Sequence, residues 1–185
     1  MEIKITLGGI SPLICNRFTE AAQQAVSQNS AAAFQGERGT PRAQAEPKVY
    51  TGSKGRPVLP AVNLLASFVD AGRFIKSGRS KLSTARSSLV PAGLAINEAE
   101  LPITPSKWEV DSRPVVIPST GGRIMCHRPR FDEWKIACTL LVDDTLFSER
   151  IVRELVDIAG KRVGVGDFRP SRRGPFGRFE VIKWN

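Results

Sequence analysis

Residues 160–179 combine residue types that suit the binding of a phosphate chain. Their sequence, GKRVGVGDFRPSRRGPFGRF, holds five glycines, six basic residues, three phenylalanines and a single acid. Glycine lets a backbone approach a ligand closely, arginine forms charge-assisted hydrogen bonds with phosphate, and aromatic rings stack on bases. We therefore predict that this segment is a loop that binds nucleic acid.

The elements expected around this loop argue against a nucleotide-cofactor site. An amphipathic helix is expected before it and a short alternating strand, residues 178–184, after it. Walker and dinucleotide loops run the other way, from a strand into a helix whose N-terminus faces the phosphate. Gly164 and Gly166 also lack the third glycine of GxGxxG, because Arg169 stands there. We expect no cofactor. The plain alternative for the glycines is that Gly160 caps a helix and the others only make turns.

Basic residues recur in three windows without an acid, residues 71–97, 112–131 and 168–179. One such window is usually a solvated loop, but three that converge on one sheet face would form a groove for a strand backbone. The predicted nucleic-acid contacts are Gly164, Gly166, Phe168, Arg169, Arg172, Arg173, Gly174, Gly177, Arg178, Arg123, His127, Arg128, Arg130, Lys76, Arg79 and Lys81. The candidates for stacking on bases, unless each belongs to the core, are Phe168, Phe176 and Trp108.

Composition narrows the class of partner. The 185 residues carry a net charge of +9, with a pI near 10, which favours a polyanion. No run approaches the roughly 18 apolar residues of a spanning helix, and no secretory leader pattern opens the chain, so we expect a cytoplasmic protein without a membrane partner. Cys15, Cys126 and Cys138 fit neither a disulfide framework nor a CxxC zinc site. With a single histidine in the chain, we expect no bound metal.

His127, in the sequence MCHRPRF, is the one candidate for a catalytic base. A nuclease that used it would need a second group to stabilise the phosphorane or protonate the leaving oxygen, a task for Arg123 or Arg128. No paired carboxylates and no nucleophile motif accompany it. We therefore favour a protein without catalytic activity.

Hydrophobic periodicity predicts the main elements. Alternation predicts strands over residues 1–7, 133–143 and 178–184, the second with Trp134 on its inward face. Helical spacing predicts one helix over residues 61–75 and another from an N-cap at Ser148 to a stop at Gly160. Residues 19–50, poor in large apolar side chains, are predicted to be a mobile insertion. Residues 76–130 are predicted to be irregular insertions with short strand-like pieces.

This order of elements predicts a single domain over residues 1–185. Its class is α+β, and we expect a ferredoxin-like fold: a split βαβ, RRM-like antiparallel sheet with long insertions.

The chain also resembles a known family. The element order, the GxG after the second helix and the run Gly174-Pro175-Phe176-Gly177-Arg178-Phe179 are similar to the RAMP superfamily, the RNA-binding proteins of CRISPR effector complexes. The motifs match from Phe131 onward; before that only the topology does. The resemblance implies a glycine-rich loop that lies against the RNA backbone. Its glycines would be Gly164, Gly166, Gly174 and Gly177, and its basic contacts Arg169, Arg172, Arg173 and Arg178. Residues 19–47 would form the family's protruding thumb, and the small size resembles a phage or mobile-element variant.

The leading hypothesis is a non-catalytic protein that binds single-stranded nucleic acid, RNA ahead of single-stranded DNA, by its backbone. It would act as a homo-oligomer in rows along the strand or as a subunit of a ribonucleoprotein. Two alternatives stay open. One is a metal-independent endoribonuclease that uses His127. The other is a phage-encoded interaction protein that mimics a CRISPR subunit.

Overall fold

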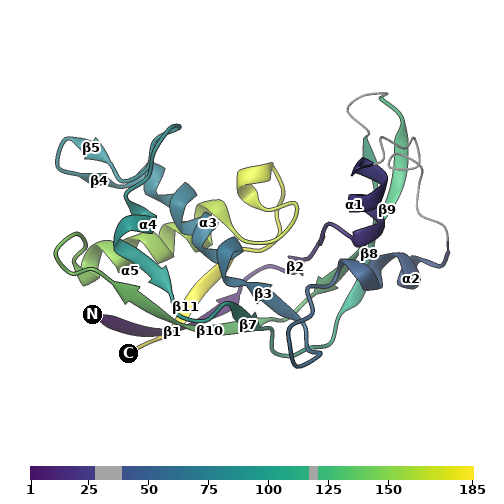
Figure 1. Ribbon diagram of the computed structural model, residues 1–185, viewed down its shortest axis with the longest axis horizontal. Coiled ribbons are helices and arrows are strands. Elements are labelled where there is room, and N and C mark those ends of the chain that lie inside the picture. Colours follow the sequence, from purple (N-terminus) through teal and green to yellow (C-terminus); the bar gives the residue numbers. More distant parts are fainter. Residues whose placement is uncertain (28–38, 117–120) are drawn as a thin grey trace.

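The computed structural model describes residues 1–27, 39–116 and 121–185 (Figure 1). Its main sheet has four strands, each antiparallel to its neighbours, in the order β11-β1-β10-β6. The bounds are β1 (Glu2–Gly9), β6 (Leu94–Ile96), β10 (Lys135–Val142) and β11 (Phe179–Trp184). The antiparallel sheet together with its helices confirms the predicted α+β class.

Side-chain alternation gives the main sheet one buried face. In β1 the buried residues are Ile3, Ile5 and Leu7, and β10 continues the same face with Ile136, Cys138, Leu140 and Val142. Trp134, just before β10, is buried as predicted and donates its ring N–H to the Ser11 carbonyl at 2.9 Å. Contrary to expectation, β1 runs on through Gly8 and Gly9. A Cβ on Gly9 would overlap the Trp134 indole, so the missing side chain lets the ring close over the strand.

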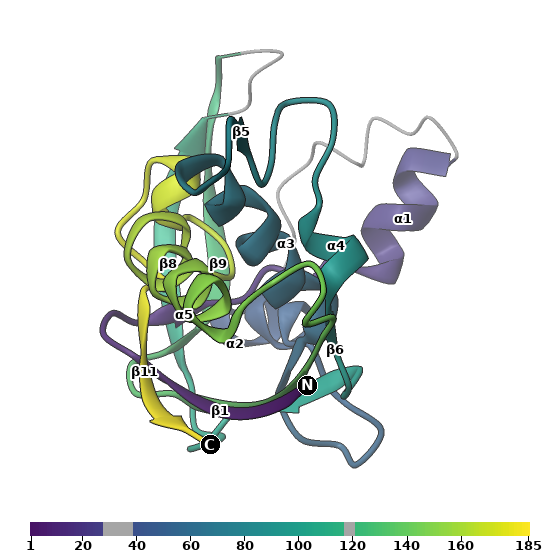
Figure 2. The ribbon, with the colours of Figure 1, turned by 90° about the vertical axis from the view of Figure 1, so that its left-hand side faces the viewer.

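Two helices cover the buried face of the sheet (Figures 1 and 2). The first, α3 (Ala61–Ala71), places Leu64, Phe68 and Ala71 in the core at helical spacing. It continues as a 3₁₀ turn, η3 (Gly72–Phe74). The second, α5 (Glu149–Ile158), buries Val152, Leu155 and Val156. Both predicted helices are therefore present where the apolar spacing placed them.

The end of α5 differs from the expectation. Gly160 does not stop the helix but lies inside a π-helical turn, η4 (Ala159–Val163). A Cβ at this position would overlap the carbonyl oxygen of Phe179, so glycine allows β11 to pack directly against the turn. The positive φ that ends the helical backbone belongs to Gly164, at +74°.

A second sheet stands beside the main one, with the order β2-β9-β8. Its strands are β2 (Leu13–Ile14), β9 (Arg123–Phe131) and β8 (Glu109–Val116), and the β8-β9 hairpin pairs from Glu109↔Arg130 to Val116↔Arg123. Around it lie α1 (Glu20–Ser27), α2 (Pro41–Ala45) and η2 (Glu46–Lys48), which form a lobe at one end of the molecule (Figure 1).

The insertions are more regular than predicted. Within residues 19–50 the structure has helices, with Ala45 and Val49 buried; residues 28–38 of this segment lie outside the described residues. Within residues 76–130 it has β4 (Lys76–Ser77), β5 (Ser80–Lys81), α4 (Val90–Gly93), β6, β7 (Glu100–Pro102), β8 and β9. Short strands such as β7, which pairs with β3 (Val58–Pro60), were not predicted because three residues are too few to show a periodic pattern. In the described part of the chain no helix has the length and apolar character needed to cross a bilayer.

Candidate nucleic-acid interface

The glycine-rich loop, residues 164–178, is folded tightly against the protein. The Val165 N–H donates to the Gly177 carbonyl at 2.9 Å, and the Gly177 N–H donates to the Pro12 carbonyl at 2.8 Å. The Asp167 N–H donates to the Ile14 carbonyl, also at 2.8 Å. These bonds attach both ends of the loop to the chain around β2.

Most of the loop glycines serve this packing. Gly164, Gly174 and Gly177 are buried, and a Cβ on Gly174 or Gly177 would overlap a backbone oxygen of the loop itself. We therefore correct the expectation that these three lie against a ligand: they shape the loop. Gly166 is half-buried and lines a cavity, so it alone among the four predicted glycines borders open space.

The arginines of the loop are more exposed than most of its glycines, although Arg169 lines the same cavity as Gly166. Arg172 and Arg173 are exposed at η5 (Pro170–Arg172), the short turn at the tip of the loop, and Arg178 is exposed before β11. Arg169 is half-buried and donates to the Gly166 carbonyl at 3.0 Å, which keeps its guanidinium beside the loop.

A cavity of about 530 Å³, here called the basic cavity, opens between the loop tip and the end of α3. Three arginines from three separate segments line it, Arg73, Arg162 and Arg172, with Asp70 as the one acid. The Arg162 guanidinium lies 5.3 Å from the centre of the Phe74 ring, which is 52% exposed. Asp70 lies 3.4 Å from Arg73, whereas Arg162 and Arg172 form no ion pair with any of the described residues. The cavity therefore has a net positive charge and an accessible aromatic ring.

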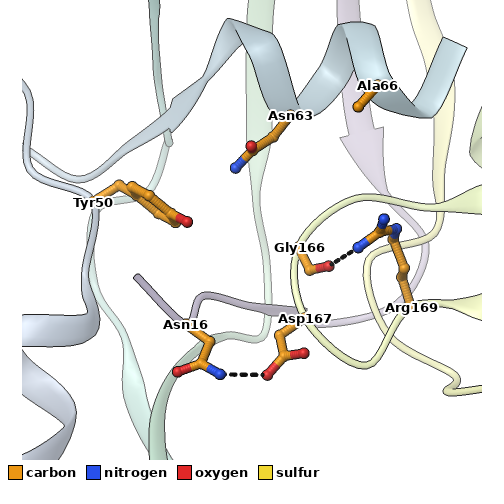
Figure 3. A pocket seen from close by; sticks show the side chains of 7 residues that line it. All are labelled: Asn16, Tyr50, Asn63, Ala66, Gly166, Asp167 and Arg169. Atoms are coloured by element: carbon orange, nitrogen blue, oxygen red, sulfur yellow. Dashed lines mark hydrogen bonds between the residues drawn. The ribbon is translucent and has the colours of Figure 1, made fainter. Parts of the chain in front are cut away.

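A second cavity of about 220 Å³, here called the polar cavity, lies next along α3 (Figure 3). It is lined by Asn16, Tyr50, Asn63, Ala66, Gly166, Asp167 and Arg169. Residues three or four apart share a helix face, so Asn63, Ala66 and Asp70 form one continuous face of α3. The two cavities follow one another along this face and along the loop, from Gly166 to Arg172.

Arg128 has a structural role that the sequence prediction missed. It is buried, with Nη2 3.1 Å from Asp111 Oδ2 and Nη1 2.9 Å from Asp167 Oδ2. Burial acts to lower the pKa of Arg128, but hydrogen bonding and charge from Asp167, with the charge of Asp111, raise it overall. The guanidinium therefore stays charged in the interior. We correct the expectation that Arg128 contacts nucleic acid: a phosphate would have to displace two carboxylates from a guanidinium that is itself buried.

The other predicted residues of β9 lie along the β8-β9 hairpin. Arg123 is exposed at its start, and Arg130 forms an ion pair with Asp132 at 2.8 Å. His127 Nδ1 is 2.7 Å from the Ser112 hydroxyl, its partner in the strand register. With Arg128 enclosed in ion pairs, one of the two groups considered for a nuclease mechanism is not accessible to a substrate.

The three basic windows occupy three places instead of one. The β4-β5 hairpin, with exposed Lys76, Arg79 and Lys81, lies at one end of the molecule, and the β8-β9 hairpin rises at the other. The glycine-rich loop lies between them, and all three project to the side of the main sheet that carries the helices (Figures 1 and 2). The three basic windows therefore lie in a row along the molecule and do not converge on one sheet face as expected.

Two of the proposed stacking rings are engaged within the protein. Phe176 is buried, with its ring centre 6.0 Å from that of Phe168, and Arg113 lies 4.8 Å above it. Trp108 is half-buried and covered by the Arg42 guanidinium at 3.4 Å. Phe168, half-buried with φ of +49°, keeps part of its surface open. The more exposed ring beside the loop is Phe74, which was not among the predicted stacking residues and lies within the helix predicted over residues 61–75.

Compared with known protein families, the chain matches none, and compared with curated protein sequences it again gives no match. Within the described ranges, no three histidine, cysteine or acidic side chains come together as a metal-binding group. The loop and its two cavities are therefore the features from which a function can be inferred.

Proposed function

We propose that the protein binds single-stranded nucleic acid, RNA ahead of DNA, by its sugar–phosphate backbone and without catalysis. The observation that carries the proposal is the basic cavity, where Arg73, Arg162 and Arg172 converge from η3, η4 and η5. Arginines brought together from distant parts of the chain and left accessible form a local positive potential that attracts an anion. Phosphate satisfies them, and the exposed Phe74 ring offers a surface for a base.

The fold supports this proposal. The strand order β11-β1-β10-β6 follows from two units, β1-α3-β6 and β10-α5-β11, each with a helix crossing the same face. We propose on this basis the ferredoxin-like, split βαβ arrangement expected from the sequence, together with the resemblance to the RAMP superfamily. Assembly in rows or within a ribonucleoprotein belongs to the same proposal.

Salt dependence tests the proposal. A labelled single-stranded oligonucleotide is titrated at several salt concentrations, and the slope of log K against log salt is expected to be about −0.7 for each phosphate neutralised. Replacement of one cavity arginine, Arg172→Ser, should weaken binding and make the slope shallower by about 0.7. The matched control is Arg150→Ser, which removes the same charge from an exposed position on α5.

The possible outcomes separate the alternatives. Equal losses in Arg172→Ser and Arg150→Ser would mean that only overall charge matters, and no binding at low salt would remove the proposal. RNA and DNA strands of one sequence are compared side by side, because contacts to the 2′-hydroxyl are what distinguish them. A protein partner that stays bound after nuclease treatment would favour the interaction-protein alternative.

A further inference from the structure

The polar cavity has a composition unlike that of the basic cavity. Figure 3 shows Asn63 on α3 and Tyr50 directed into one space from two sides, with Asn16 and Asp167 along a third and Gly166 and Arg169 along a fourth. These residues come from four separated parts of the sequence. Its lining therefore exists only in the folded protein.

Two polar groups in this cavity are available to a ligand. Among the residues that the structure describes, neither the Tyr50 hydroxyl nor the Asn63 side-chain amide has a hydrogen-bond partner. The Asn16 amide nitrogen, in contrast, donates to Asp167 at 3.0 Å, which leaves the Asn16 carbonyl oxygen available. The cavity thus offers both hydrogen-bond donors and acceptors to a ligand.

The charges in the cavity argue against a phosphate as its occupant. The Asp167 carboxylate lines it, together with the amide oxygens of Asn16 and Asn63, and acceptors of this kind repel an anion. The lining residues include one acid, Asp167, and one cation, Arg169, so the lining carries no net charge. An uncharged polar group fits this balance better than an anion does.

The size of the cavity sets a further limit. Drug-sized ligands occupy pockets of about 300 Å³ or more. A cavity of about 220 Å³ has room for something smaller, such as a single ring system. The edge of a nucleobase carries donors and acceptors side by side, and an asparagine amide can bond to such an edge with both of its polar atoms.

We propose that the polar cavity holds one unpaired nucleobase of the bound strand, while the adjoining basic cavity holds its phosphates. This inference rests on the proposed function, because the two cavities adjoin along α3 and the loop. The Asn63 amide and the Tyr50 hydroxyl bond to the edge of the base. Arg169 supplies a further donor beside the Gly166 carbonyl, to which it is already bonded.

The chain provides its own reporter for this site, since Tyr50 is its single tyrosine. Protein labelled with fluorotyrosine gives one fluorine NMR signal from the cavity. Adenosine, guanosine, cytidine and uridine are titrated separately, with free ribose as the control for the sugar. At least one nucleoside should shift the signal to saturation, and ribose should not.

Matched variants identify the site. Asn63→Ala should weaken nucleoside binding about fivefold, the value of one lost hydrogen bond. Val62→Ala, at the neighbouring and exposed position of α3, should leave it unchanged. Arg172→Ser should also leave nucleoside binding unchanged while it weakens oligonucleotide binding. Thermal unfolding of each variant checks that the fold is kept.

The outcomes distinguish this inference from the proposed function. If oligonucleotides bind and no nucleoside moves the Tyr50 signal, the base site is overturned and the proposed function stands. If nucleosides bind and no oligonucleotide does, the proposed function falls, and with it the placing of a strand in the two cavities. Equal weakening by Asn63→Ala and Val62→Ala would also overturn the base site.

Discussion

Arg128 Nη1 lies 2.9 Å from Asp167 Oδ2, and this ion pair joins β9 of the second sheet to the glycine-rich loop. The same guanidinium reaches Asp111 on β8 at 3.1 Å. Asp167 accepts two further hydrogen bonds, from the Asn16 amide and the Phe168 N–H. The one acid of the loop thus joins the backbone hydrogen bonds in fixing its position.

Replacing this acid should destabilise the protein. Asp167→Asn keeps the shape of the side chain but removes the charge that faces Arg128, and we expect a loss of about 2 kcal/mol in the free energy of unfolding. The control is Asp132→Asn, whose ion pair with Arg130 is exposed and should contribute less than about 1 kcal/mol. Urea denaturation measures both. Equal effects would show that the buried pair has no special weight.

Two glycines with nearly the same positive φ, Gly177 and Gly55, allow the cost of backbone strain to be measured separately from the cost of steric overlap. Gly177 has a φ of +69° and Gly55 a φ of +70°, but a Cβ on Gly177 would overlap the Val165 carbonyl oxygen, whereas one on Gly55 would meet no atom within 4 Å. Gly55→Ala should cost about 1 kcal/mol from the backbone alone. Gly177→Ala should cost more than 2 kcal/mol, since the overlap adds to that strain. The difference between the two unfolding free energies is the measurement. A value near zero would contradict the tight packing of the loop.

The cysteines should differ sharply in reactivity. Burial, and secondarily the charge of Asp167, raises the pKa of Cys15 to about 12, and burial with the charge of Glu98 does the same for Cys138. Cys126 is half-buried on β9. Because the thiolate is the reactive form, a thiol reagent should label one site in the folded protein and three in denaturant. Mass spectrometry locates the label, and the variant Cys126→Ser should lose the rapid reaction. Rapid labelling of Cys15 would show that the region around β2 opens readily.

The contribution of Glu98 to the stability of the protein should be lost at acid pH. Burial acts to raise the pKa of Glu98, but hydrogen bonds from the Thr139 N–H at 2.8 Å and hydroxyl at 2.9 Å leave it below its ordinary value. A lowered folded-state pKa favours the charged form, so the contribution is present above the ordinary pKa and is lost as the pH falls through the folded value. Glu98→Gln should cost about 1 kcal/mol at pH 7 and progressively less below pH 4.5. A difference independent of pH would contradict this assignment.

The parts of the fold that could be predicted are those with long periodic segments. The alternation in β1 and β10 and the helical spacing in α3 and α5 each extend over at least eight residues. The second sheet could not be predicted in the same way, because β2 has two residues and gains its place only by pairing with Phe131 and Arg130. Gly160 was misjudged for a related reason: the atom that requires a glycine there belongs to Phe179.

In the candidate site, too, the features that are local in the sequence could be predicted and those that depend on the tertiary fold could not. The loop was recognisable because its glycines and arginines are adjacent in the sequence. The cavities beside it were not, because Tyr50 and Asn63 become neighbours of Gly166 only through the tertiary fold. For Arg128 the prediction of a nucleic-acid contact was wrong. The residue lies in a basic window of the sequence, but in the fold its guanidinium is paired with Asp111 and Asp167. Composition thus suggested the kind of ligand that we propose, and the tertiary fold determines which side chains are accessible to it.

The position of β1 between β10 and β11 also has a kinetic consequence. Ile5 pairs with Cys138 on one side and Trp184 on the other, so β1 leaves the ribosome well before β10 and β11 and can pair with neither until they have been made. Contacts between residues so far apart close large loops before they gain any stability, which slows folding. During synthesis the apolar side of β1 would be left without its partners, open to association with other nascent chains or to chaperones.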